Sequence, residues 1–469
     1  MPPIASLLQL AARQVDSGPV ISLPLQDTSF TLDSSGVAGF FGGDGAVQGM
    51  ATVHLFEGRR WFGWYNTPGS YEIAKQYGQL AKARLWDGLF PGPNRDPAQL
   101  FGLDGKSGPR FLAAHSGSVI QRSGHPAYLV ARKAQSIPPE QRTPIRCTRR
   151  ASLDCSVTTV DLNYAPPADM RPRRQKSQLP LLALIPISTS IAACVLCALV
   201  EDWWCFASIA SGILASGVAC FVIGSGELTF SHPRPATGAP PGDGVLLDDE
   251  GIIVLRGSED AVNSVTRGRF CLKFASEPKY SGIGVCSIGL TAQFLVQLLL
   301  IPQGTLFGQV MFVLTLGLSW MYNAYLSALE KEDIQTDILV DLLRLQENRD
   351  VQKFALGTRT AQVVFTALLL QPREPVKTPR PLKPYNPRKL LDELLPNDTP
   401  VWDRWKEAIV EKLRAEQSLT FGDADSKVEG FTPEDQELLG GLFKDAEEAY
   451  HGWKRACFDL DADSTCKEK

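Results

Sequence analysis

Few residues of this chain combine the types and the spacing that catalysis or metal binding requires. Cys194 and Cys197 have the spacing of a redox-active pair, but they lie in an apolar run without an activating charge. His54 and Glu57 match half of an inverted zinc-protease motif, yet Gly58 stands where a second metal ligand is needed. Neither pair therefore supports the chemistry that its spacing suggests.

Two further motifs lack an essential part. Gly105-Lys106-Ser107 is similar to the end of a phosphate-binding loop, but Leu100 occupies the position of the first glycine. Asp459, Asp461 and Asp463 repeat the first ligands of a calcium-binding EF-hand loop, but a serine replaces the turn glycine and the bidentate glutamate is missing. We therefore predict no catalytic residue, no cofactor, no metal ion and no enzymatic activity.

Residues 59–65, Arg-Arg-Trp-Phe-Gly-Trp-Tyr, mix basic and aromatic side chains as single-strand nucleic-acid-binding proteins do. The whole chain carries 47 basic and 51 acidic side chains, a net charge of -4, so it lacks the basic surplus of such proteins. An isolated stretch of this kind is more typical of a strand or of a membrane-surface contact. We predict no nucleic-acid partner.

The composition averages two kinds of segment. The 469 residues are 44% hydrophobic and 21% charged, and the mean hydropathy is -0.06. Within this average, residues 179–200, 203–223, 281–301 and 306–326 are free of formal charge. At about 1.5 Å per residue each run can cross a hydrocarbon core of about 30 Å. We predict four transmembrane helices; the alternative is four buried helices of a large soluble core.

Small and polar residues are expected to hold these helices together, because hydrophobicity alone does not favour helix contacts over lipid contacts. Two glutamines share one face of the third run and could bond to Gln309 or Asn323 of the fourth; the alternative is that they are polar groups tolerated near the helix ends. The second run carries small residues at every fourth position. The helix-packing candidates are Ser208, Gly212, Ser216, Cys220, Gln293 and Gln297.

Basic residues beside the runs predict the orientation. Arg171, Arg173, Arg174 and Lys176 precede the first run, and further basic residues lie between the second and third runs and after the fourth. The two short connections, 201–202 and 302–305, carry no basic residue. Because cytoplasmic loops are rich in Lys and Arg, both termini are expected in the cytosol. The sequence does not identify the membrane.

The predicted fold is a mainly α membrane protein with four transmembrane helices in two tight hairpins, a small α+β cytosolic loop and a helical C-terminal tail. Breaker-rich and charged stretches set the limits of the segments. These are a mixed or partly disordered N-terminal region (1–135), a Pro/Arg-rich linker (136–178), a first transmembrane hairpin (179–223), the cytosolic loop (224–280), a second transmembrane hairpin (281–326), cytosolic amphipathic helices (327–371), a Pro-rich linker (372–389) and an acidic helical tail (390–469).

Residues 179–371 resemble a group of uncharacterised polytopic membrane proteins of basidiomycete fungi. The resemblance lies in residues 252–270, with Gly-Ser-Glu-Asp-Ala-Val-Asn-Ser-Val-Thr-Arg-Gly-Arg-Phe, in residues 294–321, and in Gly-Thr-Arg-Thr at 357–360. It implies a fungal membrane protein and brings no activity, cofactor or catalytic residue. Residues 1–150 are not covered by it.

Two functions remain open from the sequence. The first is an integral membrane protein that works by assembly, with membrane lipid and either further copies of the chain or another protein as partners. The second is a subunit of a transporter or channel, which would need ionisable groups or a broken helix at mid-membrane. None of the four runs has an ionisable acid or base, so the first function is favoured.

Overall fold

A computed structural model describes residues 25, 37–136, 145–146, 152–248, 251–346, 349–371 and 386–465. The chain forms two compact units, each made of three stretches. Unit 1 contains residues 1–104, 173–229 and 271–334, and unit 2 contains residues 105–172, 230–270 and 335–469. This division joins stretches that the sequence treats as separate segments.

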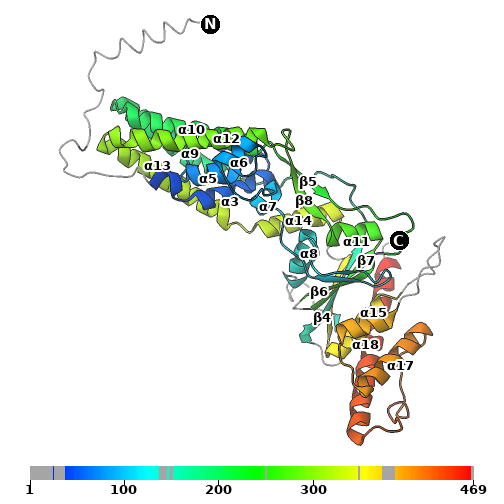
Figure 1. Cartoon of the computed structure of the whole chain (residues 1–469). Helices are drawn as coiled ribbons and strands as arrows, with labels where there is room; N and C mark the ends of the chain where they lie inside the picture. Colours follow the sequence, from blue (N-terminus) through cyan, green and yellow to red (C-terminus); the bar gives the residue numbers. More distant parts are fainter. Residues whose placement is uncertain are drawn as a thin grey trace. The chain divides into compact units, whose positions relative to one another are not determined.

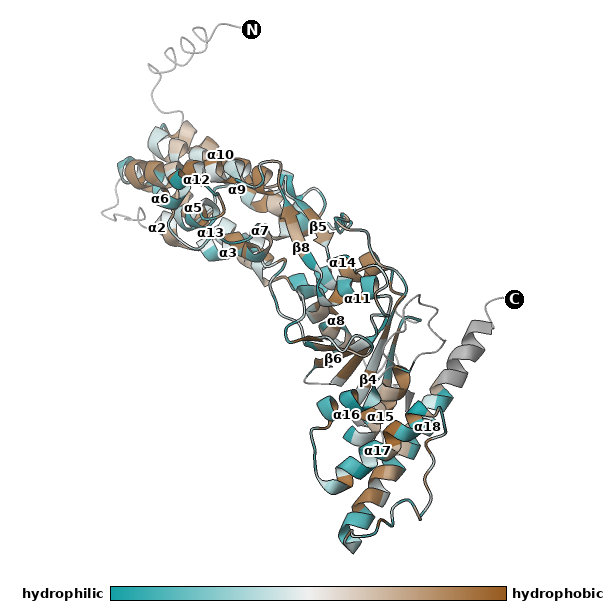
Figure 2. Ribbon diagram, turned by 45° about the vertical axis from the view of Figure 1, so that its right-hand side comes forward, coloured by the Kyte–Doolittle hydropathy of each residue, from teal (hydrophilic) through white to brown (hydrophobic). Residues whose placement is uncertain are grey.

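Unit 1 contains four helices that are long and apolar enough to cross a membrane, as predicted. A 3-10 turn, η2 (Leu179–Ala183), leads into α9 (Leu184–Leu199), which is followed by α10 (Trp203–Ile223). After α12 (Ser281–Leu300) comes a second 3-10 turn, η3 (Ile301–Gln303), and then α13 (Leu306–Ala328). Figure 2 shows the apolar character of α10 and α12 in brown.

These helices turn large apolar side chains outward and small or polar side chains inward. Exposed side chains include Ile191, Leu214, Leu299 and Met321, one from each helix. A soluble core has the opposite pattern, so the arrangement fits helices surrounded by lipid rather than helices enclosed in a water-facing globule. The buried polar side chains of the four helices include Ser190, Ser208, Ser287, Gln293, Gln297, Thr315, Ser319 and Asn323.

The N-terminal region is part of this helical bundle. It forms α2 (Val37–Phe40), α3 (Gly43–Met50), α4 (Thr52–Leu55), a 3-10 turn η1 (Arg59–Trp61), α5 (Ser70–Gly78), α6 (Arg84–Leu89) and α7 (Pro97–Leu100). Helix α5 packs along α12, and α3 packs along α13 (Figure 1). α5 and α6 are separate helices, because residues 79–83 between them are not helical.

The four long helices pack in pairs that differ from the order in which they follow one another in the sequence. α9 and α10 pack against each other, whereas α12 packs on α10 and α13 packs on α9. The ring of Phe294 in α12 contacts Phe40 edge-on and Tyr71 at a tilt, and the ring of Trp320 in α13 contacts Phe41 at a tilt. The short connection predicted between α12 and α13 is present as η3 and residues 304–305, but the two helices pack on α10 and α9, so a tight second hairpin stays a prediction.

Unit 2 is built on a mixed seven-stranded sheet with the order β2-β1-β6-β7-β4-β9-β3. β6 and β7 both belong to the loop predicted at 224–280; they lie at the centre of the sheet and pair antiparallel. β7 and β4 pair in parallel, as do β3 and β9; the other neighbours are antiparallel. The strands are β1 (Arg110–Ala113), β2 (Val119–Ile120), β3 (Ile145–Arg146), β4 (Ser152–Leu162), β6 (Gly244–Asp248), β7 (Gly251–Gly257) and β9 (Val351–Leu356).

Two groups of helices pack on this sheet. α15 (Arg359–Leu369) packs on β4, β7 and β9 and contacts α18 (Pro433–Thr465). α16 (Pro387–Leu394) and α17 (Pro400–Arg414) complete this cluster. α8 (His125–Ser136) and α11 (Glu259–Thr266) pack together against β6 and β7. The sheet is thus far larger than the small α+β loop expected from the sequence. Its strands come from the sequence before, between and after the long helices.

The remaining elements include a separate two-stranded sheet of β5 (Glu227–Ser231) and β8 (Arg269–Lys273), and α14 (Lys331–Leu343) after α13. α11 begins after Ser258, whose hydroxyl accepts from the Ala261 amide at 3.3 Å. The C-terminal tail contains α16, α17 and α18. Of the predicted Pro-rich linker (372–389), only residues 386–389 are described. The predicted Pro/Arg-rich linker (136–178) is described at 136, 145–146 and 152–178, and it contains β3 and β4, so this stretch forms part of the sheet.

Candidate functional site

A non-helical loop of residues 62–69 lies inside the bundle of unit 1. η1 ends where Phe62 leaves the helical region, at φ -109° and ψ 41°. Toward the end of the loop, Pro68 lacks an amide donor and Gly69 adopts a φ of 70° before α5 begins. Residues 65–69 are buried. Non-helical backbone is tolerated at membrane depth only where protein or a water-filled cavity surrounds it. We call residues 62–69 the inner loop.

Asn66 joins the inner loop to three of the four long helices. Its backbone amide donates to Ser190 Oγ at 3.1 Å, and its side-chain Nδ2 donates to Thr315 Oγ1 at 3.0 Å. Gln297 Nε2 donates to Asn66 Oδ1 at 3.1 Å. Ser190 and Thr315 lie near the middle of α9 and α13, so this fully buried asparagine is a polar centre within the bundle.

The neighbouring residues of the inner loop bind the fourth long helix more extensively. Tyr65 Oη donates to Asn323 Oδ1 at 2.8 Å, and Asn323 Nδ2 donates to Thr67 Oγ1 at 3.2 Å. All three side chains are buried. Together with Asn66, these bonds hold three consecutive residues in one position and extend the polar centre toward the C-terminal end of α13.

Arg59 of η1 places a buried positive charge beside this network. It is 2% exposed, its Nη1 donates to Phe62 O at 2.8 Å, and its guanidinium lies 5.4 Å from the ring centroid of Tyr322. Its Nη1 also lies 3.8 Å from Cys220 Sγ, and its Nε has no hydrogen-bond partner. None of the described carboxylates forms an ion pair with this guanidinium.

Several other polar atoms buried in unit 1 have no partner. Gln293 is 2% exposed, and neither its Nε2 nor its Oε1 is bonded; the Oε1 of Gln297 is also free. Buried polar atoms are nearly always satisfied by protein, water or a ligand. The unpaired hydroxyls in this part of the molecule are those of Ser70, Tyr77, Ser319 and Tyr322. The interior of unit 1 therefore has unused capacity for hydrogen bonds.

The small-residue stripe predicted on α10 faces the chain's own interior. Ser208, Gly212, Ser216 and Cys220 are all buried. A Cβ at Gly212 would lie 2.0 Å from Asn66 Oδ1, so glycine is required for the close approach of the inner loop. α10 packs most closely with α12, as small residues allow.

The two glutamines of α12 do not form the predicted bonds to α13. Gln297 binds Asn66 and lies with its Nε2 3.3 Å from Ser208 O, and Gln293 is unpaired. Gln309 instead donates to the backbone of residues 301 and 304, each at 3.2 Å. Gln297 therefore binds the inner loop in place of α13, and Gln309 binds the connection before its own helix.

Asp202 ties the two predicted helix connections together. It is 3% exposed, and its Oδ2 accepts from the amide and the hydroxyl of Thr305 at 2.8 Å and 2.6 Å. Its Oδ1 accepts from the Cys205 amide at 3.1 Å, which caps α10. This buried carboxylate is at the tip of the bundle and has a structural role.

The motifs considered for chemistry remain apart from one another. His54 lies between Phe101 and Phe274, and burial, together with Arg174, lowers its pKa from 6.5 to about 3. Cys194 and Cys197 are free thiols buried among apolar side chains. In the described part of the chain, no group of three or more His, Cys, Asp or Glu residues could hold a metal ion. The side chains of the aspartates at 459, 461 and 463 lie outside the described residues.

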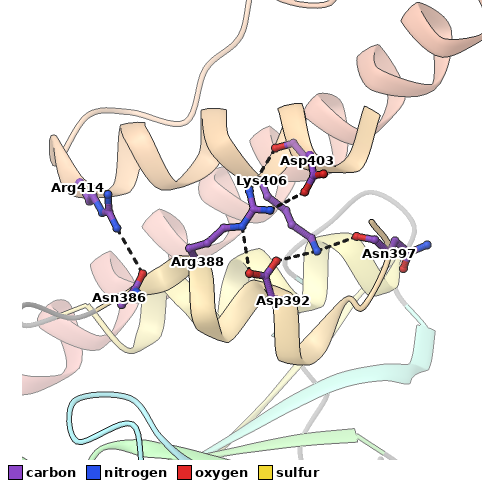
Figure 3. Close-up of polar contacts among 7 residues, drawn as sticks. All are labelled: Asn386, Arg388, Asp392, Asn397, Asp403, Lys406 and Arg414. Carbon is purple, nitrogen blue, oxygen red and sulfur yellow. Dashed lines mark hydrogen bonds and ion pairs between the residues drawn. The ribbon is translucent and has the colours of Figure 1, made fainter. Parts of the chain in front are cut away.

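The tail of unit 2 contains an ion-pair cluster between α16 and α17 (Figure 3). Lys406, which is 2% exposed, donates to Asp392 Oδ1 at 2.9 Å and to Asn397 O at 2.8 Å. Arg388 bonds to both Asp392 and Asp403. Burial alone would raise the pKa of Asp392, but the bonds from Lys406 and Arg388 lower it. Every charge in the cluster is paired, so it stabilises helix packing.

Sequence reasoning missed Asn66, Tyr65 and Arg59 as parts of one site. One signal was available: from Gly36 to Phe56 the sequence contains a single acid, Asp44, and no Lys or Arg. Such charge depletion is typical of segments that contact apolar surroundings. No family model matches the chain, and no curated protein or solved structure matches it either.

Proposed function

We propose that this integral membrane protein takes up a small polar solute or an ion in the interior of unit 1, as part of a transporter or channel. The observation that carries the proposal is the inner loop: non-helical, polar backbone that reaches the middle of α9 and α13, and the C-terminal part of α12, through Asn66. Broken backbone of this kind forms solute sites in many transporters. The unpaired atoms of Gln293 and Gln297 add free hydrogen-bonding capacity to the same interior.

Assembly through the α10 stripe is the weaker candidate. Gly212 is covered by Asn66, and Gly63 of the inner loop approaches Cys220 so closely that an added Cβ would lie 2.2 Å from the Cys220 Cβ. A surface already occupied within the chain is unavailable to a second copy. Self-association or another protein partner would therefore use a different surface.

The orientation forms part of the proposal. The basic residues that flank the long helices place both termini in the cytosol by the positive-inside rule. The connections at 201–202 and 302–305, which Asp202 joins, then face the opposite side. The resemblance to fungal membrane proteins stays a prediction.

Flux measurements on the full-length protein in liposomes test the proposal. After an osmotic step with urea, glycerol or potassium chloride plus a potassium ionophore, at least one solute should equilibrate several-fold faster than in protein-free vesicles. Asn66→Leu should abolish that increase, and Thr315→Val, which removes one hydrogen bond, should reduce it. Asn94→Leu is the matched control, because Asn94 is exposed.

Two outcomes would contradict this function. One is that every solute equilibrates at the protein-free rate. The other is that Thr315→Val and Asn66→Leu conduct like the unchanged protein while melting normally in detergent. Either result would leave unit 1 as a membrane anchor with a structural polar core.

A further inference from the structure

A small cavity lies in unit 1 next to the inner loop. Its volume is about 10 Å³, which is enough for one water-sized occupant. The polar residues that line it are Arg59, Tyr65, Thr67, Tyr77, Ser216 and Asn323. The other described residues that line it are apolar or glycine, and none of the described lining residues carries a carboxylate. Its walls therefore combine one positive charge with hydroxyl and amide groups.

The charge of Arg59 is not balanced at this site. Its Nε–H is buried without a partner, and its Nη1 is bonded to a neutral carbonyl, Phe62 O. The face of the Tyr322 ring lies 5.4 Å from the guanidinium and offers only partial compensation. A buried charge is normally paired, because it has lost its hydration. An anion would supply the missing partner.

The hydroxyl groups around the cavity reinforce this preference. Tyr77 is fully buried, and its hydroxyl has no partner. Thr67 Oγ1 accepts from Asn323, so its own hydrogen remains able to donate. A hydroxyl and a guanidinium can both donate to an anion, whereas a metal cation would be repelled by Arg59.

We infer that this cavity binds a monatomic anion of the size of chloride. The cavity has room for little more than one water-sized occupant, which favours a monatomic anion over a polyatomic one such as sulfate. The inference names the class of ligand, a monatomic anion. It rests on the proposed function for the statement that unit 1 takes up solutes. Arg59 supplies the charge, and Tyr77 and Thr67 supply neutral donors.

The cavity lies in the half of the bundle away from Asp202. Ser216 and Asn323 belong to the C-terminal halves of α10 and α13, and Leu290, which also lines the cavity, belongs to the N-terminal half of α12. Under the proposed orientation this half faces the cytosol. The inner loop links the cavity to the mid-membrane polar centre, because Tyr65 lines the cavity and the next residue is Asn66.

Chloride binding to the full-length protein in detergent tests the inference directly. In gluconate buffer of constant ionic strength, the protein should broaden the ³⁵Cl NMR signal, and bromide but not sulfate should reverse the broadening. Chloride should also raise the melting temperature relative to gluconate, because a ligand of the folded state stabilises it. Arg59→Met should weaken chloride binding at least tenfold. Arg95→Met, at an exposed arginine, should leave it unchanged.

Tyr77→Phe covers the case in which Arg59→Met fails to fold. It removes only the unpaired hydroxyl and should weaken chloride binding several-fold. The inference is overturned if the unchanged protein shows no halide-specific broadening, so that the cavity holds water only. It is also overturned if Tyr77→Phe and a folded Arg59→Met bind chloride normally.

The binding and flux experiments separate the two proposals. Solute flux without chloride binding overturns the anion site and leaves the transport function standing. Chloride binding without flux of any solute overturns the transport function and leaves the ion as a structural counter-charge to Arg59.

Discussion

Gln297 of α12 donates a hydrogen bond to Asn66 of the inner loop at 3.1 Å, across 231 residues of sequence. The bond is buried and connects the N-terminal region to a helix long enough to cross a membrane. Together with the bonds to Ser190 and Thr315, it makes Asn66 a shared polar partner of α9, α12 and α13. The N-terminal region is therefore a structural component of unit 1.

Gly212→Ala should destabilise unit 1, because the added Cβ would lie 2.0 Å from Asn66 Oδ1 and 3.1 Å from Gln297 Nε2. Overpacking at such a site costs about 1–3 kcal/mol. Thermal unfolding in detergent measures the effect. Gly317→Ala in α13 is the control, since nothing lies within 4 Å of its Cβ and alanine favours helix by up to about 1 kcal/mol. Equal melting temperatures for both variants would contradict the close approach of the inner loop.

Thr305→Val should loosen the tip of the bundle. The variant removes the hydroxyl that donates to Asp202 Oδ2 at 2.6 Å and keeps the backbone donor, so a cost of about 1–2 kcal/mol is expected. A double-mutant cycle with Asp202→Asn should show a coupling of about 1 kcal/mol. Thr189→Val provides the comparison, because its exposed hydroxyl bonds only within α9. If the stability losses of Thr305→Val and Asp202→Asn simply add in the double variant, the two side chains are not coupled.

Stability should fall as the pH falls from about 6.5 toward about 3, and His54 should contribute to this loss. Burial lowers the pKa of His54 from 6.5 to about 3, so the unfolded chain takes up a proton in this range and the folded chain does not. Above about pH 6.5 His54 is neutral in both the folded and the unfolded chain, so this loss of stability is absent there. Unfolding in detergent between pH 7 and pH 4 should show a shallower loss for His54→Gln.

His451→Gln serves as the matched histidine control, because His451 is exposed on α18. Its pH profile should coincide with that of the unchanged protein. An identical profile for His54→Gln would mean that other groups cause the acid sensitivity.

The sequon Asn397-Asp-Thr399 should remain unglycosylated in cells and in microsomes. Asn397 is exposed between α16 and α17, so a luminal tail would offer it to the glycosylation machinery. Protease added to sealed microsomes should also digest the tail. A mass increase that endoglycosidase removes and that Asn397→Gln prevents would reverse the proposed orientation.

Local patterns were sufficient for many elements. The four long helices follow from the exclusion of charge, and α11 follows from the Ser258 cap. The β6–β7 hairpin follows from two short apolar runs around a turn whose residues 249–250 lie outside the described part. In each case residues close together in the sequence are sufficient to explain why the element forms.

The seven-stranded sheet and the inner loop required long-range pairing. β7 pairs with β4 in parallel although the first two long helices separate them, and no local pattern specifies that register. The buried state of Asn66 likewise depends on side chains far away in the sequence, namely Ser190, Gln297 and Thr315.

The amino-acid sequence by itself determined which stretches suit lipid, because transfer of charge into a membrane is costly and its absence is visible residue by residue. Only the tertiary structure decided which groups occupy the interior of unit 1. A polar residue such as Asn66 or Arg59 has the same side chain in water and in a helical bundle, and its environment arises from partners that folding brings from three separate parts of the chain.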